Sequence, residues 1–242
     1  MSGRGTLYVG TSGFAYKEWK GSFYPQDLPE RQMLAYYSGR LPSVEINYTF
    51  RRLPTESALE DWRRQAGAGF RITLKAFQRI THTKRLKDCR EEVDLFVRRA
   101  RRLDDRLGVI LFQLPPTLAY DRGRLEEFLA GLAPRGRPIC PYAMEFRHPS
   151  WSDPEVETLL GAHGVARCAA ETETSGVPSI PGTSSHVYLR LRKDDYSREE
   201  LSRWGSRLEN VLAAGRDVYC YFKHEGAMGP AYCLALKDRV GV

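Results

Sequence analysis

The chain has 242 residues, 42% of them hydrophobic and 28% charged, so it has the composition of an ordinary globular protein and is long enough for one large core. Thirty-seven basic against thirty acidic residues give a formal charge of +7, which is compatible with anionic partners but selects none. No apolar stretch is long enough to span a bilayer, so we expect no membrane partner.

The five cysteines are odd in number and form no Cys-x-x-Cys pair, which argues against a disulfide framework and against a thiolate zinc site. The N-terminal residues enter a strand-like run at Leu7 without the long apolar segment of a secretion signal. Together these features predict a reducing, cytoplasmic location.

Apolar runs rich in β-formers alternate with longer runs of helical period along the chain. The predicted strands cover residues 7–10, 43–48, 70–75, 107–113, 142–146, 164–169, 186–191 and 217–222. The predicted helices cover residues 30–38, 55–65, 89–103, 121–132, 153–163, 198–212 and 230–237. This alternation indicates an α/β protein with one domain, residues 1–242, folded as a TIM-type (β/α)8 barrel.

One crossover departs from this pattern. Residues 171–185, ETETSGVPSIPGTSS, are too rich in Gly, Pro, Ser and Thr for a good helix, so we expect an extended loop between strands 6 and 7. An open doubly wound sheet is the alternative fold, but its G-x-G-x-x-G fingerprint is missing.

Several strands carry polar residues on one face only. Glu45 and Asn47 alternate with apolar residues in the second strand, and Glu145 and Arg147 do so in the fifth. Because helices should cover the apolar face, we expect the polar face to point into the barrel near its carboxyl end, where barrel enzymes have their active sites. Other polar residues late in their strands are Lys75, Gln113, Arg190 and Lys223.

The longer motifs resemble those of a known family. They are GTSGFAYKEWKGSFYP at 10–25, VEINYTFRRLP at 44–54, THTKRL from Thr81, LFQLPP at 111–116 and MEFRHPSW at 144–151. In this order they resemble the YecE-like family, domain of unknown function seventy-two, over nearly the whole chain. The resemblance implies a TIM-barrel fold. It implies no particular reaction, because the family has no generally established one.

Ten polar or aromatic positions match the family pattern: Glu45, Asn47, Lys75, His82, Gln113, Glu145, Arg147, His148, Trp151 and Arg190. Two positions depart from it. Arg51 stands where the family generally has tyrosine, and Arg192 stands where it often has histidine. Both departures add positive charge, so they point to an altered substrate or a weakened site.

These residues predict an enzyme that acts on an anionic or phosphate-containing substrate at the carboxyl-end mouth. The predicted catalytic residues are Glu45, Glu145 and His148, with one glutamate serving as acid or base in a hydrolase or lyase. The predicted substrate-binding residues are Asn47, Lys75, His82, Gln113, Arg147, Trp151, Arg190 and Lys223.

Other functions remain open at this point. Nucleic-acid binding or a repair-type nuclease would use the basic charge and the aromatic residues of the upper loops. A glycoside hydrolase would use the paired carboxylates. A non-catalytic anion-binding protein would use the same cations, with Arg51 and Arg192 strengthening capture.

No obligatory metal or other cofactor is predicted. A divalent metal is the alternative, because Glu45, Glu145, His82 and His148 are suitable oxygen and nitrogen ligands. However, the chain contains no His-Glu-x-x-His motif, and neighbouring cations could neutralise the carboxylates without a metal.

Overall fold

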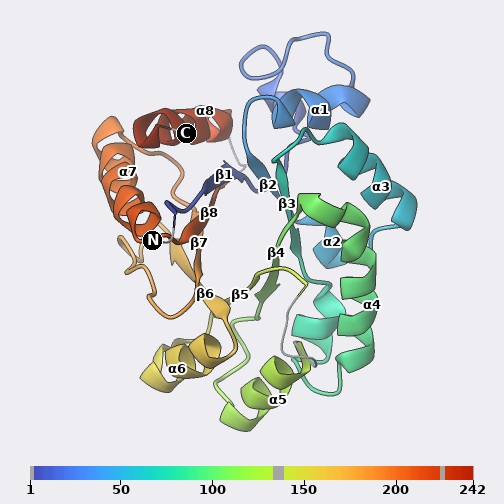
Figure 1. Ribbon diagram of the computed structural model, residues 1–242, viewed down its shortest axis with the longest axis vertical. Helices are drawn as coiled ribbons and strands as arrows, with labels where there is room; N and C mark the ends of the chain where they lie inside the picture. Colours follow the sequence, from blue (N-terminus) through green and yellow to red (C-terminus); the bar gives the residue numbers. More distant parts are fainter. Residues whose placement is uncertain (1–2, 133–138, 224–226, 242) are drawn as a thin grey trace.

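The computed structural model describes residues 3–132, 139–223 and 227–241. Eight strands form one sheet, and every paired neighbour is parallel, in the order β1-β8-β7-β6-β5-β4-β3-β2. The strands are β1 (Leu7–Thr11), β2 (Ser43–Ile46), β3 (Arg71–Lys75), β4 (Leu107–Gln113), β5 (Tyr142–Glu145), β6 (Val165–Glu171), β7 (His186–Leu191) and β8 (Asp217–Phe222). Figure 1 shows them around a common centre with the helices outside. This arrangement confirms the predicted TIM-type barrel.

The barrel closes where β1 meets β2, through a single bridge instead of a full ladder. Ser12 pairs with Glu45 in parallel, and the amide of Gly13 donates to the Glu45 carbonyl oxygen at 2.7 Å. Gly10 makes this approach possible, because a Cβ at that position would lie 1.8 Å from the carbonyl oxygen of Ser43. The closure places the Glu45 side chain beside the end of β1.

The helices follow the strands as the sequence pattern predicts. They are α1 (Met33–Ser38), α2 (Tyr48–Arg51), α3 (Glu56–Gln65), α4 (Arg90–Ala100), α5 (Arg122–Leu132), α6 (Pro154–Ala162), α7 (Arg198–Ala213) and α8 (Gly229–Val240). Local signals fix several helix starts: Ser197 and Glu200 form a capping box on α7, and Asp153 caps α6 just before Pro154. The crossover from β6 to β7 has no helix, as expected for its composition.

The structure differs from the predicted elements mainly in several short helical segments that were not predicted. The expected strand at 43–48 ends at Ile46, and the chain turns into α2 from Tyr48. The expected helix at 89–103 ends at Ala100 and continues as the 3-10 segment η4 (Arg101–Arg106). Further short segments are η1 (Lys17–Trp19), η2 (Glu30–Gln32), the π-helix η3 (Arg79–Thr83) and η5 (Pro149–Ser152). Segments this short have too few residues to show a helical period.

Two separate cores support the barrel. A small core fills its interior, and a large core lies between the sheet and the surrounding helices. The interior core consists of Val109, Leu111, Ala143, Ala166, Cys168, Tyr188, Tyr219 and Tyr221. Above it, towards the carboxyl ends of the strands, the inward positions become polar.

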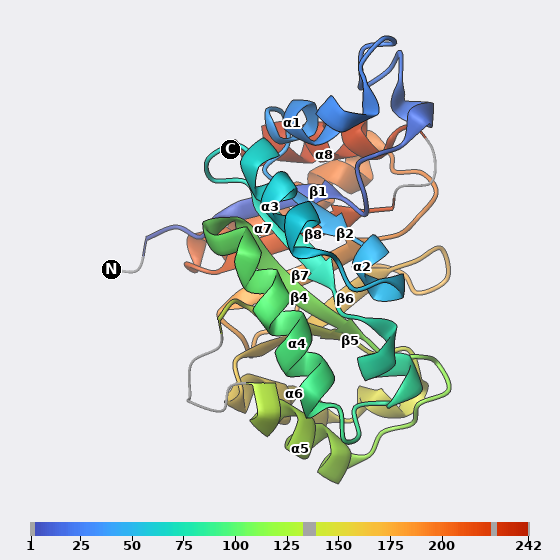
Figure 2. The ribbon, with the colours of Figure 1, turned by 90° about the vertical axis from the view of Figure 1, so that its right-hand side faces the viewer.

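The loop after β1, helix α2 and the crossover after β6 gather at one end of the barrel, opposite the N-terminal residues (Figure 2). This end is the carboxyl-end mouth, where barrel enzymes carry their chemistry. Within the described residues, no helix is both long and apolar enough to cross a membrane.

Candidate active site

Arg190 is the centre of a charged cluster inside the mouth. Its side chain is 1% exposed, and one terminal nitrogen donates to Glu145 Oε2 at 2.6 Å and to Gln113 Oε1 at 3.0 Å. The other terminal nitrogen donates to Glu45 Oε1 at 2.7 Å. Four strands that are far apart in the sequence thereby meet at one guanidinium. A buried ion of this kind is tolerated because its charge is paired and hydrogen-bonded.

Glu45 is fully buried and its carboxylate is saturated with donors. Ser12 Oγ donates to Oε1 at 2.7 Å, beside the bond from Arg190, and the Tyr188 hydroxyl donates to Oε2 at 2.5 Å. Burial opposes ionisation, but Arg190, Arg192 and these hydrogen bonds outweigh it and lower the pKa of Glu45 to about 2. Glu45 is therefore a carboxylate at neutral pH.

Glu145 holds two arginines at the end of β5. Its Oε2 accepts from Arg190, and its Oε1 accepts from Arg147 Nε at 2.9 Å. Burial again opposes ionisation, and the charges of Arg190 and Arg147 overcome it, so the pKa of Glu145 is lowered. The pKa values of both glutamates are lowered, so they do not distinguish one glutamate as the acid and the other as the base.

Lys75 ends β3 and is half-buried beside this cluster. Its Nζ lies 4.2 Å from the centre of the Phe50 ring, and that ring meets the His82 ring edge to face at 4.8 Å between centroids. No carboxylate among the described residues forms an ion pair with Lys75. Burial, followed by the charge of Arg190, lowers the pKa of Lys75 to about 8.

His82 belongs to η3, the segment that follows β3. Its Nδ1 lies 2.9 Å from Thr81 Oγ1. Burial and the nearby positive charges of Lys75 and Arg147 lower the pKa of His82, so its neutral form predominates at neutral pH. The ring forms part of the rim and does not bond to either glutamate in the hydrogen bonds of the described residues.

Arg192 is a second guanidinium beside the cluster, and it is unpaired among the described residues. Burial and the charge of Arg190 lower its pKa. Counting four cations, Lys75, Arg147, Arg190 and Arg192, against the two glutamates leaves a net +2 when all six are charged.

Unsatisfied polar atoms concentrate at this mouth. In the part of the chain that the structure describes, the buried side-chain nitrogen and oxygen atoms without a hydrogen-bond partner are Asn47 Oδ1, Gln65 Oε1, Arg190 Nε, Arg192 Nε and Arg207 Nη1. Three of these five belong to Asn47, Arg190 and Arg192. Buried polar atoms are nearly always paired with protein or ordered water, so three unpaired atoms on neighbouring residues are unusual.

Three predicted site residues lie apart from the cluster. His148 caps η5, where its Nδ1 lies 2.8 Å from Ser150 Oγ. Lys223 pairs with Asp194 at 2.8 Å. Trp151 is completely buried and stacked on Phe146.

Trp151 cannot bind a substrate as the sequence suggested, because substrate stacking needs an accessible ring. Its indole nitrogen donates to the carbonyl oxygen of Leu118 at 2.7 Å, and the Tyr120 ring covers another side. It is therefore a packing residue that holds the loop after β5 against the loop after β4.

Sequence reasoning missed two residues that complete the cluster. Tyr188 lies two positions before Arg190 on β7, so strand alternation places it on the same inward face. Ser12 carried no comparable signal, because its role depends on the closure of β1 against β2.

Within the described residues, no three His, Cys, Asp or Glu side chains are grouped to hold a metal ion. The two glutamates of the mouth bind arginine instead, and the two predicted histidine ligands, His82 and His148, bond to neighbouring hydroxyl groups. The donor set therefore does not fit the metal site considered from the sequence.

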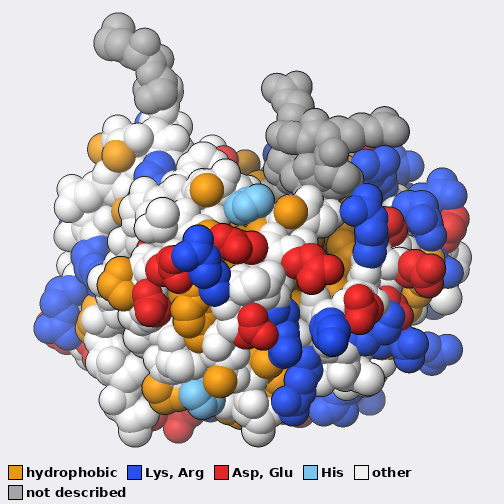
Figure 3. Space-filling model, turned by 90° about the horizontal axis from the view of Figure 1, so that it is seen from below, with side chains coloured by type: hydrophobic (Ala, Val, Ile, Leu, Met, Phe, Trp, Pro, Cys, Tyr) orange, Lys and Arg blue, Asp and Glu red, His pale blue; other side chains and the backbone are white. Residues whose placement is uncertain are grey.

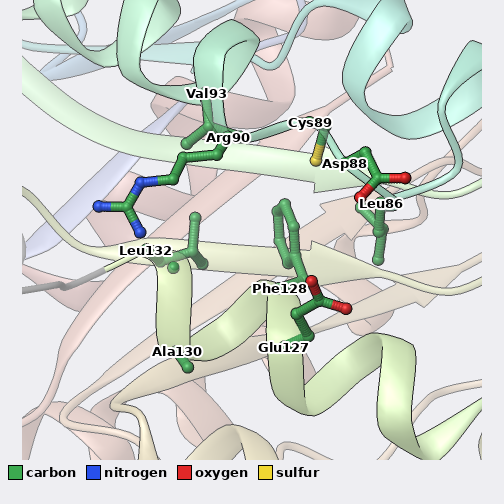
Figure 4. Close-up of a pocket in the computed structure, with 10 residues that line it drawn as sticks. Leu86, Asp88, Cys89, Arg90, Val93, Glu127, Phe128, Ala130 and Leu132 are labelled. Carbon is green, nitrogen blue, oxygen red and sulfur yellow. The ribbon is translucent and has the colours of Figure 1, made fainter.

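Two of the surface pockets differ in their position relative to the mouth cluster. The pocket in Figure 4 lies between α4 and α5, and its lining, which includes Cys89, Val93 and Phe128, shares no residue with the mouth cluster. A second pocket of about 400 Å³ lies beside β5, β6 and α6, and Glu145 is the one residue of the mouth cluster in its lining.

Residues 8–242 match the family described as "Protein of unknown function DUF72". The chain belongs to the DUF72 family. It is the same family as the YecE-like family that its motifs resemble, so the fold and the family agree. The family assignment leaves the activity to be argued from the site.

Solved DUF72 structures share the whole architecture. A DUF72 protein from Thermotoga maritima is 25% identical with a TM-score of 0.76, covering 98% of this chain and 100% of that one. One from Enterococcus faecalis is 15% identical with a TM-score of 0.78, covering 98% and 96%, and shows the fold alone. Among curated proteins, the UPF0759 protein YunF of Bacillus subtilis is 26% identical over 90% of this chain and 88% of its own length.

Proposed function

We propose that this DUF72 protein is an enzyme that binds a small anionic substrate at the carboxyl-end mouth of its barrel. The observation that carries the proposal is a pair of unpartnered guanidinium N–H groups: Arg190 and Arg192 each have a buried Nε without a hydrogen-bond partner among the described residues. An anion would accept hydrogen bonds from these groups and offset the net +2 of the cluster. Phosphate and carboxylate groups are the anions that guanidinium binds best.

The two glutamates position the cations in this proposal. Glu45 and Glu145 are ionised and occupied by Arg190, so neither has a proton to donate. Lys75 is the group whose protonation can change near neutral pH, since its pKa is about 8. A hydrolase or lyase at this site would therefore use Lys75 for proton transfer or nucleophilic attack, and the arginines for charge stabilisation.

Inorganic phosphate tests the binding part of the proposal. Phosphate at about 10 mM should raise the melting temperature of the wild type by a few degrees, because a ligand of the native state stabilises it. The Arg192→Met variant should lose most of this rise. Arg98→Met is the matched control, since Arg98 is exposed on α4 and unpaired among the described residues. An equal rise in wild type and Arg192→Met would refute the proposal.

Turnover separates an enzyme from a non-catalytic anion-binding protein. A panel of phosphate esters and 2-oxo acids should contain at least one substrate, and Lys75→Met should lower its turnover by at least about 100-fold while phosphate binding persists. Binding without turnover over the whole panel would favour a capture protein.

A divalent metal is tested separately. After equilibration with Mg²⁺, Mn²⁺ and Zn²⁺ and removal of excess ions, we expect less than one tightly held ion per chain, because Arg190 already occupies both carboxylates. Elemental analysis gives the answer. A stoichiometric ion that is lost in Glu145→Gln would contradict this expectation.

A further inference from the structure

Among the described residues, Lys75 has no carboxylate partner although it lies beside two buried glutamates, whereas three other half-buried lysines are ion-paired. Lys84 pairs with Glu92, and Lys193 pairs with Glu200. Lys223 pairs with Asp194. Within the described part of the chain, the Lys75 ammonium lies against the face of the Phe50 ring. Glu45 and Glu145, the two acids that interact electrostatically with Lys75, each form an ion pair with Arg190.

The surroundings of Lys75 make its neutral amine more populated near neutral pH than that of an ordinary lysine, because its pKa is lowered to about 8. Charged or titratable groups face it from several elements: Glu45 from β2, Glu145 from β5, Arg190 and Arg192 from β7, and His82 from η3. Burial is the main cause that disfavours the Lys75 charge; Arg190 and Arg192 act in the same direction, and Glu45 and Glu145 oppose them. The Phe50 ring excludes water from one side of Nζ, and its π face attracts the ammonium, so this contact orients Nζ at the rim. A desolvated lysine beside other cations is the arrangement that makes an amine nucleophilic.

We propose that Lys75 is a nucleophile that forms an imine with an anionic carbonyl compound held by Arg190 and Arg192. This inference rests on the proposed function, because the arginines supply the anion site, and it narrows the substrate to a carboxylate- or phosphate-bearing aldehyde or ketone. The carbonyl carbon would lie at Nζ while the anionic group meets the two unpartnered Nε atoms.

The covalent step balances without any further reactant. The lone pair of the neutral amine attacks the carbonyl carbon, and the electrons of the C=O double bond move to oxygen. Both amine protons are transferred to that oxygen, which leaves as water while the C=N bond forms. The imine nitrogen then takes up one proton and becomes an iminium ion, an electron sink for a lyase-type bond cleavage.

Reductive trapping on the wild-type protein tests the inference. Glyoxylate is the anionic probe and acetaldehyde the neutral one, each with cyanoborohydride, which delivers hydride to the iminium carbon and makes the adduct permanent. Peptide mass spectrometry compares Lys75 with Lys87, which is exposed and unpaired among the described residues. At about pH 7.5, glyoxylate should modify Lys75 at least about tenfold faster than Lys87.

The pH dependence gives a second readout. The modification rate of Lys75 should level off above about pH 8, whereas that of Lys87 should keep rising to about pH 10, where an ordinary lysine loses its proton. Excess inorganic phosphate should slow the reaction at Lys75 and leave Lys87 unchanged. Equal rates at the two lysines would overturn the inference.

The outcomes separate this inference from the proposed function. If phosphate raises the melting temperature through Arg192 but Lys75 reacts no faster than Lys87, the anion site stands and the nucleophile is refuted. If Lys75 reacts selectively but glyoxylate has no advantage over acetaldehyde and phosphate does not protect, the anion site is refuted, and the inferred substrate class fails with it. Selective reaction with glyoxylate and protection by phosphate support both.

Discussion

Arg190 determines the chemical character of the mouth, because one buried guanidinium ties up both carboxylates. In a barrel with a free pair of glutamates, acid and base roles would be natural. Here each glutamate forms an ion pair with Arg190, and the other charged groups of the cluster are cations. Among the described residues of the cluster, Arg192 and the Nε of Arg190 lack a hydrogen-bond partner, and Lys75 lacks a carboxylate partner.

Removing the charge of Glu45 should destabilise the fold. Glu45→Gln leaves a terminal nitrogen of Arg190 without its anionic partner in a fully buried site, so unfolding free energy should fall by about 3 kcal/mol. Urea denaturation followed by circular dichroism measures it. Glu91→Gln, an exposed position on α4, is the control and should change stability by less than about 0.5 kcal/mol. Similar losses in the two variants would contradict a central role for the Glu45–Arg190 pair.

The same carboxylate predicts how stability responds to acid. The pKa of Glu45 is lowered from 4.5 to about 2 in the folded protein, so the unfolded state binds its proton first as the pH falls. Its contribution is therefore complete above about pH 4.5 and disappears towards pH 2. Stability measured over this range should fall less steeply in Glu45→Gln than in the wild type. Identical slopes would show that other carboxylates dominate.

At the scale of elements, the seam between β1 and β2 is the weak point of the barrel, because one bridge replaces a ladder. The seam also delivers Ser12 to Glu45, so closure and site geometry depend on the same contact. The short helices α2 and η3 contribute Phe50 and His82 to the rim directly after β2 and β3. Elements too short to predict therefore shape the entrance.

Gly10→Ala should open this seam. The added methyl would fall 1.8 Å from the Ser43 carbonyl oxygen, so the two strands must separate, and we expect a loss of about 3 kcal/mol in unfolding free energy. Gly67→Ala is the matched control, since a Cβ there meets nothing within 4 Å. It should be neutral or slightly stabilising. A Gly10→Ala protein as stable as the control would mean that β1 and β2 can relax apart without cost.

At the scale of the whole molecule, the positive charge is partly paired where it is most concentrated. Lys and Arg side chains gather on the side of Figure 3 on which α3 and α4 lie in Figure 1, with acidic side chains among them. Arg102 pairs with Glu56 at 2.6 Å, and Arg63 lies 3.7 Å from Asp104. Within the arginine run of α4 and η4, Arg102 is ion-paired, whereas Arg98 is exposed and has no acidic partner among the described residues.

This distribution predicts weak, non-specific binding of nucleic acid. The aromatic residues considered for base stacking are packed on one another instead, with Trp19 and Tyr24 buried. Labelled single-stranded and duplex DNA should therefore bind with a dissociation constant no tighter than about 1 μM at 0.15 M salt, unchanged by Arg192→Met. Fluorescence anisotropy at two salt concentrations measures it. Tighter binding that depends on Arg192 would favour nucleic-acid processing.

The sequence by itself determined the barrel and the inward face of its strands. The alternation of β-rich and helical runs placed all eight strands within a few residues, since each run has its own period and length. Strand alternation also put Glu45, Glu145 and Arg190 on the inward face. The irregular crossover followed from the glycine and proline content of residues 171–185.

Only the tertiary structure decided which of these charges pair and which remain free. Glu45 and Arg190 are 145 residues apart, and their contact depends on barrel closure, which no local pattern encodes. The same holds for the burial of Trp151 and the isolation of Lys75, because both follow from neighbours that other strands and loops supply. Periodicity reports which face a side chain takes, whereas pairing, burial and pKa depend on distances between distant segments.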